Sequence, residues 1–255
     1  MGYSTVYGPV KSWRLGRSLG VDLLAVDSVC SFRCIYCQLG KINQTKAERS
    51  IFVTTEKVMD DLSESEWTGA DVVTISGSGE PTLAKNLGEV VQLVKVFTGK
   101  PVVVLTNSTM LESEDVRRDL CEADRVFCKL DAWNDGMLDR INRPNPGITL
   151  ESVVNGIASL RREFAGGLAV QTMLLREMDE NDWIDYARLI NRIEPDEIQL
   201  NTPSRPVPAT FAIGNRENAT EAEPGAHILK TVSRDRLLSV RDRIEPLVSC
   251  KVLVK

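Results

Sequence analysis

Short apolar runs alternate with amphipathic stretches along most of the chain, beginning near residue 21. The runs have the length of buried strands, and stretches between them place apolar residues at helical spacing, as Val90, Val91, Val94 and Phe97 do. Six strand–helix alternations with short turns are typical of right-handed βαβ units in a parallel sheet. The pattern predicts strands at residues 21–26, 71–76, 102–106, 125–130, 168–174 and 197–200, and helices at residues 55–62, 83–97, 113–121, 150–164, 182–192 and 235–244.

The number of alternations predicts the architecture. Eight βα units would close a full barrel, whereas six leave it open. We therefore predict an α/β fold, an open partial (β/α)6 barrel with a C-terminal helical extension, in a single domain spanning residues 1–255. Its core would cover about residues 20–201, and the extension would cover residues 227–255.

Residues 202–226 have no hydrophobic period and hold four of the eleven prolines. In a barrel this segment would follow the sixth strand and lie at the carboxyl face, where active sites are built. Two interpretations remain open: a lid over a substrate, or a plain connection to the last helix.

Composition narrows the class of protein. With 42% hydrophobic and 26% charged residues among 255, the chain is an ordinary globular protein and not a disordered, collagen-like or disulfide-stapled one. No apolar run approaches the roughly 20 residues that a membrane span needs, and the first residues hold no apolar segment long enough for a signal peptide. We therefore expect a cytoplasmic protein without a membrane partner.

The net charge of −5 hides an asymmetry. Residues 1–50 carry seven Lys or Arg against three Asp or Glu, whereas the remainder is acidic. A basic segment on an acidic body can mark a face that meets an anion, although ordinary scatter of solvated charges explains the same count.

Three of the six cysteines, Cys30, Cys34 and Cys37, fall within eight residues, directly after the first predicted strand. In a reducing compartment such clustering indicates a metal site, and three thiolates on one loop suit an iron–sulfur cluster or zinc. A structural zinc site needs four protein ligands, yet the only histidine, His227, lies 190 residues from Cys37. A cubane held by three thiolates would instead leave one iron open to a small chelating molecule.

The segment VCSFRCIYC at residues 29–37, with its C-x3-C-x2-C spacing and Tyr36 before the last cysteine, resembles the cluster loop of the radical S-adenosylmethionine (SAM) enzymes. The resemblance implies a partial barrel of the radical SAM type, with the three cysteines as ligands of a [4Fe–4S] cluster. It also implies that SAM binds the open iron and is cleaved to a 5′-deoxyadenosyl radical, which abstracts hydrogen from a substrate. An electron donor such as flavodoxin or ferredoxin would supply the electron of this oxidoreductase chemistry, which is run under anaerobic conditions.

The segment SGSGEP at residues 76–81 fits the same resemblance. Small residues permit close approach of the backbone to a ligand, and Glu80 offers a carboxylate to an ammonium group. The segment is similar to the G-G-E motif that holds the methionyl amine of SAM, with Ser78 in place of a glycine. The resemblance implies these cofactor-binding residues: Tyr36, Gly77, Ser78, Gly79, Glu80, Asn107, Asp131, Gln171 and Asn201.

Some of these assignments have alternatives. Asn107 ends the third strand and either contacts a ligand or closes a turn. On the sixth strand either Gln199 or Asn201 would face the cofactor, as Gln171 would on the fifth.

Period-two alternation places Lys129 and Asp131 on one face of the fourth strand and Cys128 on the other. A lysine inside a barrel is costly unless it is paired. Lys129 therefore either forms a structural ion pair with Asp131 or has a lowered pKa suited to Schiff-base or proton chemistry. Lys129 and Arg143 are the candidate catalytic residues.

Further motifs are similar to the superfamily branch that contains wyosine-base tRNA synthases and uncharacterised iron–sulfur oxidoreductases. They are YGPV at residues 7–10, INRP at residues 141–144 and NTP at residues 201–203. Wyosine synthases hold a second cluster on cysteines upstream of the radical SAM loop, and this chain has none before Cys30. Cys121, Cys128 and Cys250 are available for another cluster, but their positions favour buried thiols.

Three functions remain open. The favoured one is an enzyme acting on a protein, peptide or small metabolite, because a chain with a pI of about 5.2 lacks the extended basic footprint of nucleic-acid-binding domains. The second is a tRNA- or RNA-modifying enzyme of the wyosine kind, and the third is a non-enzymatic iron–sulfur or zinc protein. In the second, phosphates would be contacted by Arg14, Arg17, Arg33, Lys41, Lys46 and Arg49.

Overall fold

The computed structural model describes residues 4–25, 27–217 and 224–255. The strands are β1 (Val6–Ser12), β2 (Gly16–Val21), β3 (Val29–Cys30), β4 (Gln44–Thr45), β5 (Val72–Ile75), β6 (Val102–Thr106), β7 (Arg125–Lys129), β8 (Gly167–Met173), β9 (Glu197–Asn201) and β10 (Lys251–Val254). Eight of them form one sheet in the order β1-β2-β5-β6-β7-β8-β9-β10, and β3 pairs with β4 separately. In the large sheet β1 and β2 are antiparallel, and from β2 to β10 each neighbouring pair is parallel.

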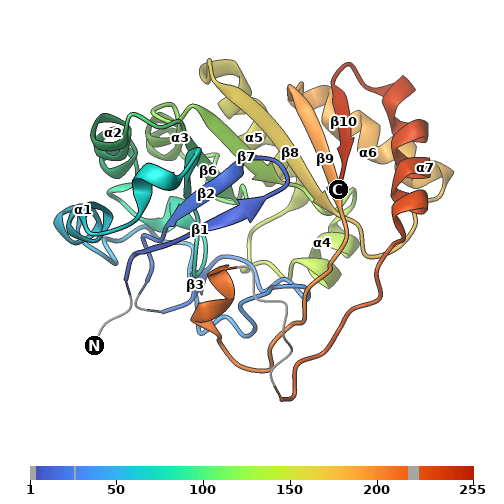
Figure 1. Ribbon diagram of the computed structural model, residues 1–255. Helices are drawn as coiled ribbons and strands as arrows, with labels where there is room; N and C mark the ends of the chain where they lie inside the picture. The colour runs from blue at the N-terminus through green and yellow to red at the C-terminus, as the bar shows by residue number, and fades with distance from the viewer. Residues whose placement is uncertain (1–3, 26, 218–223) are drawn as a thin grey trace.

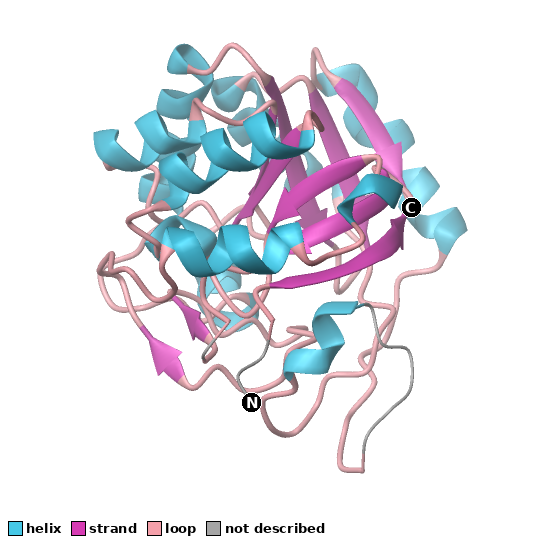
Figure 2. Ribbon diagram, turned by 60° about the vertical axis from the view of Figure 1, so that its left-hand side comes forward, coloured by secondary structure: helices cyan, strands magenta, loops and turns pink. Residues whose placement is uncertain are grey.

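The sheet order has two ends, β1 and β10, so the curved sheet is an open partial barrel (Figure 1). Helices surround its outer face, while the β3–β4 pair and irregular segments gather at one end (Figure 2). The helices are α1 (Thr55–Ser63), α2 (Leu87–Thr98), α3 (Glu114–Leu120), α4 (Asp135–Ile141), α5 (Leu150–Glu163), α6 (Glu180–Ile193) and α7 (Arg234–Ile244), with short 3-10 turns η1 (Trp67–Gly69), η2 (Pro81–Leu83), η3 (Ile213–Glu217) and η4 (Glu245–Leu247). In the described part of the chain, none of these helices combines the length and apolarity that crossing a bilayer requires.

The two faces of the sheet carry different cores. The outer face packs against the helices through a continuous cluster that includes Val104, Cys128 and Ile198. The inner face holds only a small cluster, Val72, Val103, Phe127 and Ala169. Alternate residues of a strand therefore point outward to the helices and inward to the barrel, as the alternation in the fourth predicted strand indicated.

The fold class predicted from the alternations is confirmed: a mixed α/β architecture with an open, mostly parallel sheet. Asp179 caps α6, because its side chain accepts a hydrogen bond from the Asp182 backbone in a reciprocal capping box.

The first strand was predicted at the wrong place. It is β2, Gly16–Val21, and not residues 21–26, of which residue 26 lies outside the described residues. Asp22 ends the strand, because its Oδ1 accepts a hydrogen bond from the Leu24 backbone at 2.9 Å and turns the chain. β2 was not recognised because it contains polar residues. One of them, Ser18, is tolerated inside the sheet because its hydroxyl is hydrogen-bonded to that of Thr74 on the neighbouring strand β5.

Besides the short β3–β4 pair and the 3-10 turns, three elements were not predicted from the sequence. β1 forms a hairpin with β2, α4 precedes the 142–147 loop, and β10 adds a parallel strand beside β9 within the extension expected to be helical. β10 has only four residues with one buried apolar side chain, Val252, so its sequence pattern is too short to identify.

Replacing Ile198 by alanine tests how far the fold depends on the outer core. Ile198 is fully buried in β9, so Ile198→Ala should lower the free energy of unfolding by about 2–5 kcal/mol in a denaturant titration. Ile228→Ala is the matched control, because Ile228 is 74% exposed and its loss should cost within about 0.5 kcal/mol. Equal costs for the two variants would contradict this core assignment.

Candidate active site

The three clustered cysteines lie on one loop at the carboxyl end of the parallel strands. Cys30 is held by the pairing of β3 with β4, and the Cys37 backbone donates to the carbonyl of Cys34 at 3.1 Å. The loop is fastened to the end of α4, since Arg33 N donates to the Asn142 carbonyl at 2.8 Å. Backbone pairing therefore fixes all three thiols on one short segment.

Amide groups are directed at two of the sulfurs. Asn142 Nδ2 lies 3.3 Å from Cys34 Sγ, and Asn107 Nδ2 lies 3.5 Å from Cys30 Sγ. The Phe32 backbone N–H also donates to Cys30 Sγ, at 3.4 Å. Donors of this kind stabilise a thiolate over a thiol, and they tune the sulfur ligands of iron–sulfur clusters.

Burial raises the pKa of all three thiols, to about 12 for Cys34. For Cys30 the further causes include the Glu80 carboxylate and the neighbouring Cys34 and Cys37, so the three sulfurs lie close enough to repel one another as thiolates. Among the described residues, no group of three His, Cys, Asp or Glu side chains has the arrangement for a single metal ion. A bound iron–sulfur cluster would instead lower the pKa values of these thiols, because a thiol that coordinates a metal is deprotonated. The donor set thus fits a cluster held by thiolates.

The glycines of the second motif are required by close contacts. Gly79 pairs with Val29 in a parallel bridge, and a Cβ at Gly79 would lie 1.7 Å from the Val29 carbonyl oxygen. Gly77 has a φ of 153°, and a Cβ there would lie 2.2 Å from Cγ of Asp22. The backbone of this turn is therefore packed directly against the cysteine loop and the end of β2.

Glu80 is buried and fully engaged. Its carboxylate accepts hydrogen bonds from the Thr82 backbone and hydroxyl, from the Thr106 hydroxyl at 2.7 Å and from the Asn107 backbone at 2.5 Å. Burial raises its pKa in spite of these donors. Glu80 therefore joins the ends of β5 and β6, and its oxygens point at these donors and not into open space.

Asp131 is a second buried carboxylate, with 2% of its surface exposed. It accepts hydrogen bonds from the Tyr36 hydroxyl, from Asn142 Nδ2 at 2.8 Å and from the Met173 backbone at 2.7 Å. Lys129 Nζ lies 3.1 Å from the same carboxylate, so the structural ion-pair alternative for Lys129 is the one observed. Burial and the Asp131 charge raise the pKa of Tyr36 well above its ordinary value.

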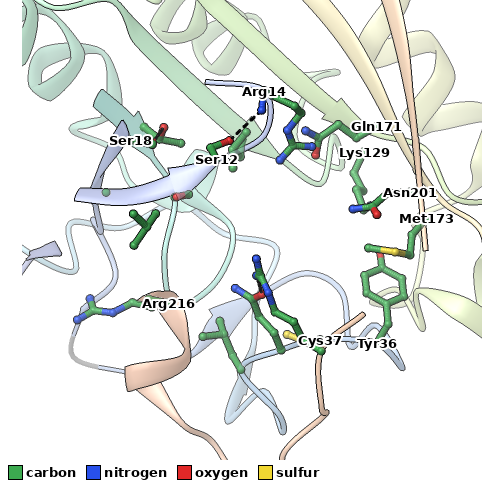
Figure 3. A pocket seen from close by; sticks show the side chains of 18 of the residues that line it. Ser12, Arg14, Ser18, Tyr36, Cys37, Lys129, Gln171, Met173, Asn201 and Arg216 are labelled. Atoms are coloured by element: carbon green, nitrogen blue, oxygen red, sulfur yellow. Dashed lines mark hydrogen bonds between the residues drawn. The ribbon is translucent and has the colours of Figure 1, made fainter. Parts of the chain in front are cut away.

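A cavity of about 670 Å³ opens beside these groups, within the range of small-molecule sites. Figure 3 shows Arg14, Gln171 and Lys129 at one side of it and Tyr36 and Cys37 at another. Of the residues predicted from the sequence, the following line the cavity: Cys30, Tyr36, Cys37, Gly77, Gly79, Lys129, Gln171, Asn201, its alternative Gln199, and Arg14. Cys34 is not part of the lining.

The other nominated residues lie behind or outside the cavity lining. Ser78, Glu80, Asn107 and Asp131 are engaged in the hydrogen bonds that hold the strand ends and the cysteine loop. Arg143 is an exposed residue just beyond α4, with a positive φ of 49°, and it does not line the cavity. A catalytic role for Arg143 therefore has no geometric basis in this structure.

The Pro-rich segment folds against the cysteine loop. Residues 202–205 line the cavity, and the Ala212 backbone donates to the Leu39 carbonyl at 2.9 Å. Arg216, in η3, forms a buried ion pair with Asp22 at 2.8 Å. Residues 218–223 of the expected lid lie outside the described residues.

Two supporting residues, Asn142 and Asp22, were not predicted from the sequence. Asn142 contacts both Cys34 and Asp131 but was quoted only as part of a motif. Asp22 accepts hydrogen bonds from Ser78 N at 3.0 Å, from Ser78 Oγ at 2.8 Å and from Arg216. Its only sequence signal was a carboxylate inside the apolar run at residues 21–26. Ser78, at the position where the resemblance implies a glycine, therefore bonds to Asp22 through both its backbone and its hydroxyl.

The remaining three cysteines and Arg49 do not line the cavity and have other surroundings. Cys128 is a buried thiol on the outer face, as expected, whereas Cys121 is exposed, because α3 ends at Leu120 and leaves it outside the core. Cys250 is half-buried before β10. Arg49, one of the proposed phosphate contacts, is instead paired with Asp119 and bonded to two backbone carbonyls.

Replacing Gly79 by alanine should disrupt the contact between the second motif and the cysteine loop. The added Cβ meets a backbone carbonyl, so Gly79→Ala should lower the free energy of unfolding by about 1–3 kcal/mol or more. Gly214→Ala is the control, because a Cβ there meets no atom within 4 Å. A Gly79→Ala variant as stable as the control in chemical denaturation would show that the turn is not packed as described.

Replacing Arg216 by methionine should leave Asp22 buried without its cation. Breaking a buried pair by removing one partner typically costs about 3–5 kcal/mol. The exposed pair of Arg188 with Asp185 supplies the comparison, since Arg188→Met should cost no more than about 1 kcal/mol. Urea titrations measure the free energy of unfolding of both variants. An equal loss in the two would contradict the conclusion that the Arg216–Asp22 pair holds η3 in place.

The sequence matches the Radical SAM superfamily over residues 27–190. A UPF0026 protein of Synechocystis is 47% identical over 218 residues, covering 86% of this chain and 82% of that protein. A UPF0026 protein of Methanocaldococcus jannaschii is 33% identical, covering 78% of this chain and 64% of that protein. Among solved structures, a radical SAM methyltransferase from Sphaerobacter thermophilus matches 93% of this chain and 65% of its own, with a TM-score of 0.62 and 14% identity. This chain thus spans just under two thirds of the archaeal relative and of the methyltransferase.

Proposed function

We propose, because this chain belongs to the radical SAM superfamily, that it cleaves SAM reductively and directs the resulting radical at a substrate bound in the cavity. Membership confirms the resemblance seen in the cysteine loop. The chain is accordingly an enzyme whose cofactors are a [4Fe–4S] cluster and SAM, and the non-enzymatic alternative is excluded.

The observation that carries the proposal is the meeting of two motifs at one cavity. Cys30 and Cys37 line it beside Gly77 and Gly79, and close backbone contacts hold the two segments together. When bound, the cofactors supply a primary carbon radical at C5′ of the adenosyl group, formed by one-electron cleavage of a carbon–sulfur bond.

The residues of the chain then have separate tasks. Cys30, Cys34 and Cys37 would ligate three irons, and the side-chain amides of Asn107 and Asn142 would orient the first two sulfurs. The remaining tasks belong to groups that line the cavity. The Gly77 and Gly79 backbone would admit the methionyl part of SAM, and Gln171 and Asn201 would offer hydrogen bonds to its sugar or base.

Lys129 is the titratable group best placed to serve a substrate. Its Nζ lies in the cavity lining, is held by Asp131 at 3.1 Å and lies 5.2 Å from the centre of the Tyr36 ring. Such an anchored ammonium can donate a proton or a hydrogen bond in a fixed direction. A hydrogen-atom acceptor at C5′ also requires that competing hydrogen-atom donors be kept away, and the segment at residues 202–205, which lines the cavity, would help to do so.

A compact substrate, either a small metabolite or the end of a peptide, fits a cavity of about 670 Å³ better than a folded RNA does. An external one-electron donor, such as a flavodoxin or ferredoxin, would complete the reaction. Nothing in the arrangement of Arg49 favours the RNA alternative, because its guanidinium is committed to Asp119.

The decisive experiment is anaerobic reconstitution with iron and sulfide, followed by dithionite and SAM, with 5′-deoxyadenosine as the measured product. The wild type should form it, and Cys34→Ala should lose at least about 100-fold of this activity together with part of the bound iron, because a ligand is missing. Cys121→Ala should retain both, since Cys121 is exposed at the end of α3. A fully iron-loaded wild type as inert as Cys34→Ala would refute the proposal.

A further inference from the structure

The cavity is strongly cationic. In a chain of net charge −5, six cationic side chains line it, and no Asp or Glu is found among the described residues of its lining. The six are Lys11, Arg14, Lys129, Arg205, Arg216 and Lys255. A cleft lined by one sign of charge focuses the field and concentrates ions of the opposite sign.

Two of the six cations are already neutralised. Lys129 is paired with Asp131 at 3.1 Å, and Arg216 is paired with Asp22 at 2.8 Å. In contrast, Lys11, Arg14, Arg205 and Lys255 form no ion pair with an Asp or Glu side chain in the described part of the chain. Lys11 is exposed to solvent, so the other three charges are the part of the cavity that the proposed cofactor chemistry leaves unexplained.

Arg14 is held in place but incompletely bonded. It lies in the β1–β2 turn, donates from Nη1 to Gln199 Oε1 at 3.1 Å and lies over the Phe127 ring at 5.6 Å. Gln199 is itself fixed by Gln171 Nε2 at 2.9 Å. Arg14 Nε is buried without a hydrogen-bond partner among the described residues. The guanidinium therefore has a fixed direction and spare donors (Figure 3).

Arg205 and Lys255 complete a group of three. Arg205 donates to the Gln38 side chain beside the cysteine loop, and Lys255 Nζ lies 3.2 Å from Ser204 Oγ at the rim. Burial lowers the pKa of Arg14 to about 10, and the nearby charge of Arg205 is the next cause. Burial also lowers the pKa of Lys255, followed by the charges of Arg205 and Arg14. The three cationic groups therefore lie close enough to repel one another.

We propose that Arg14, Arg205 and Lys255 form an oxyanion subsite for the substrate of this enzyme. That substrate carries at least two negative charges, on a phosphate group or on several carboxylate groups. Guanidinium forks match the geometry of both oxyanions, and an ammonium adds a point charge. A bound oxyanion removes the mutual repulsion and gives Arg14 Nε a partner. The inference rests on the proposed function, because it names the substrate class of the same cavity.

The subsite lies on different elements from the cofactor end. Its residues come from the β1–β2 turn and from the segments that follow β9 and β10, whereas Gly77 and Gly79 follow β5. β6, β7 and β8 separate β5 from β9 in the sheet order. The β1–β2 turn precedes β2, whose first part pairs with the start of β5 (Ser18 opposite Val72), so the turn lies at the opposite end of the strands from Gly77 and Gly79. The cavity therefore has room for the carboxylate of SAM at one end and for a substrate anion at the other.

The test is isothermal titration calorimetry of the reconstituted, SAM-saturated protein with pyrophosphate, citrate and inorganic phosphate, at two salt concentrations. Pyrophosphate or citrate should bind more tightly than phosphate, and added salt should weaken binding. Arg14→Gln and Arg205→Gln should each weaken it by about tenfold or more, because each removes charge-assisted hydrogen bonds. Arg188→Gln, at an exposed pair on α6, is the matched control and should bind as the wild type does.

The relative affinities distinguish the two oxyanions: tighter pyrophosphate indicates a phosphorylated substrate, and tighter citrate a polycarboxylate. If circular dichroism shows that Arg14→Gln does not fold, the anion affinities of Arg205→Gln and Lys255→Gln still test the subsite. Three results overturn the subsite: no anion binding, equal affinity in all variants, or competition between the anion and SAM. Displacement of pyrophosphate by a much more tightly bound RNA oligonucleotide also overturns it, since the substrate would then be a macromolecule.

Failure of the subsite is separable from failure of the proposed function. The same preparation is assayed for 5′-deoxyadenosine without any anion. Product without anion binding refutes only the subsite. Anion binding without product refutes the radical chemistry and leaves a cationic site of another purpose.

Discussion

Three buried carboxylates at the carboxyl ends of the strands determine how the site is assembled. A carboxylate cannot remain inside a protein unless donors replace its water, and unpaired burial is very costly. Asp22 after β2, Glu80 after β5 and Asp131 after β7 each meet that demand with side chains and backbone groups from other segments. The need to satisfy these charges draws the cysteine loop, the glycine turn and η3 together.

Asp131 shows how one buried carboxylate positions several groups of the site at once. It binds Tyr36 from the cysteine loop, Asn142 from beyond α4 and Lys129 from β7. Asn142 in turn reaches the sulfur of Cys34. One buried charge thereby aligns a sulfur ligand, an aromatic wall and the ammonium that faces the cavity, so a change at Asp131 would disturb all three without touching a substrate.

The sequence allowed the outer architecture and the cluster loop to be predicted, for a physical reason. Strands buried on both faces read as apolar runs, and the cysteine spacing needs no tertiary information. The site could be predicted only in part, because the functions of Glu80 and Asn107 depend on which segments pack beside them. β2 was misplaced because its inward face is polar, with Ser18 paired to Thr74. The cationic group was not predicted, because Arg14 and Lys255 stand 241 positions apart in the chain.

The separation of the two ends of the cavity has a consequence for how such an enzyme diversifies. The glycine turn follows β5 and Asp131 follows β7, both inside the sheet order, while Arg14 lies in the β1–β2 turn and Lys255 follows β10 at the two ends of that order. Edge elements pack against fewer neighbours, so they tolerate exchange better than central strands. Substrate preference can therefore drift by remodelling a hairpin or a terminal strand, while the radical-generating apparatus is inherited unchanged.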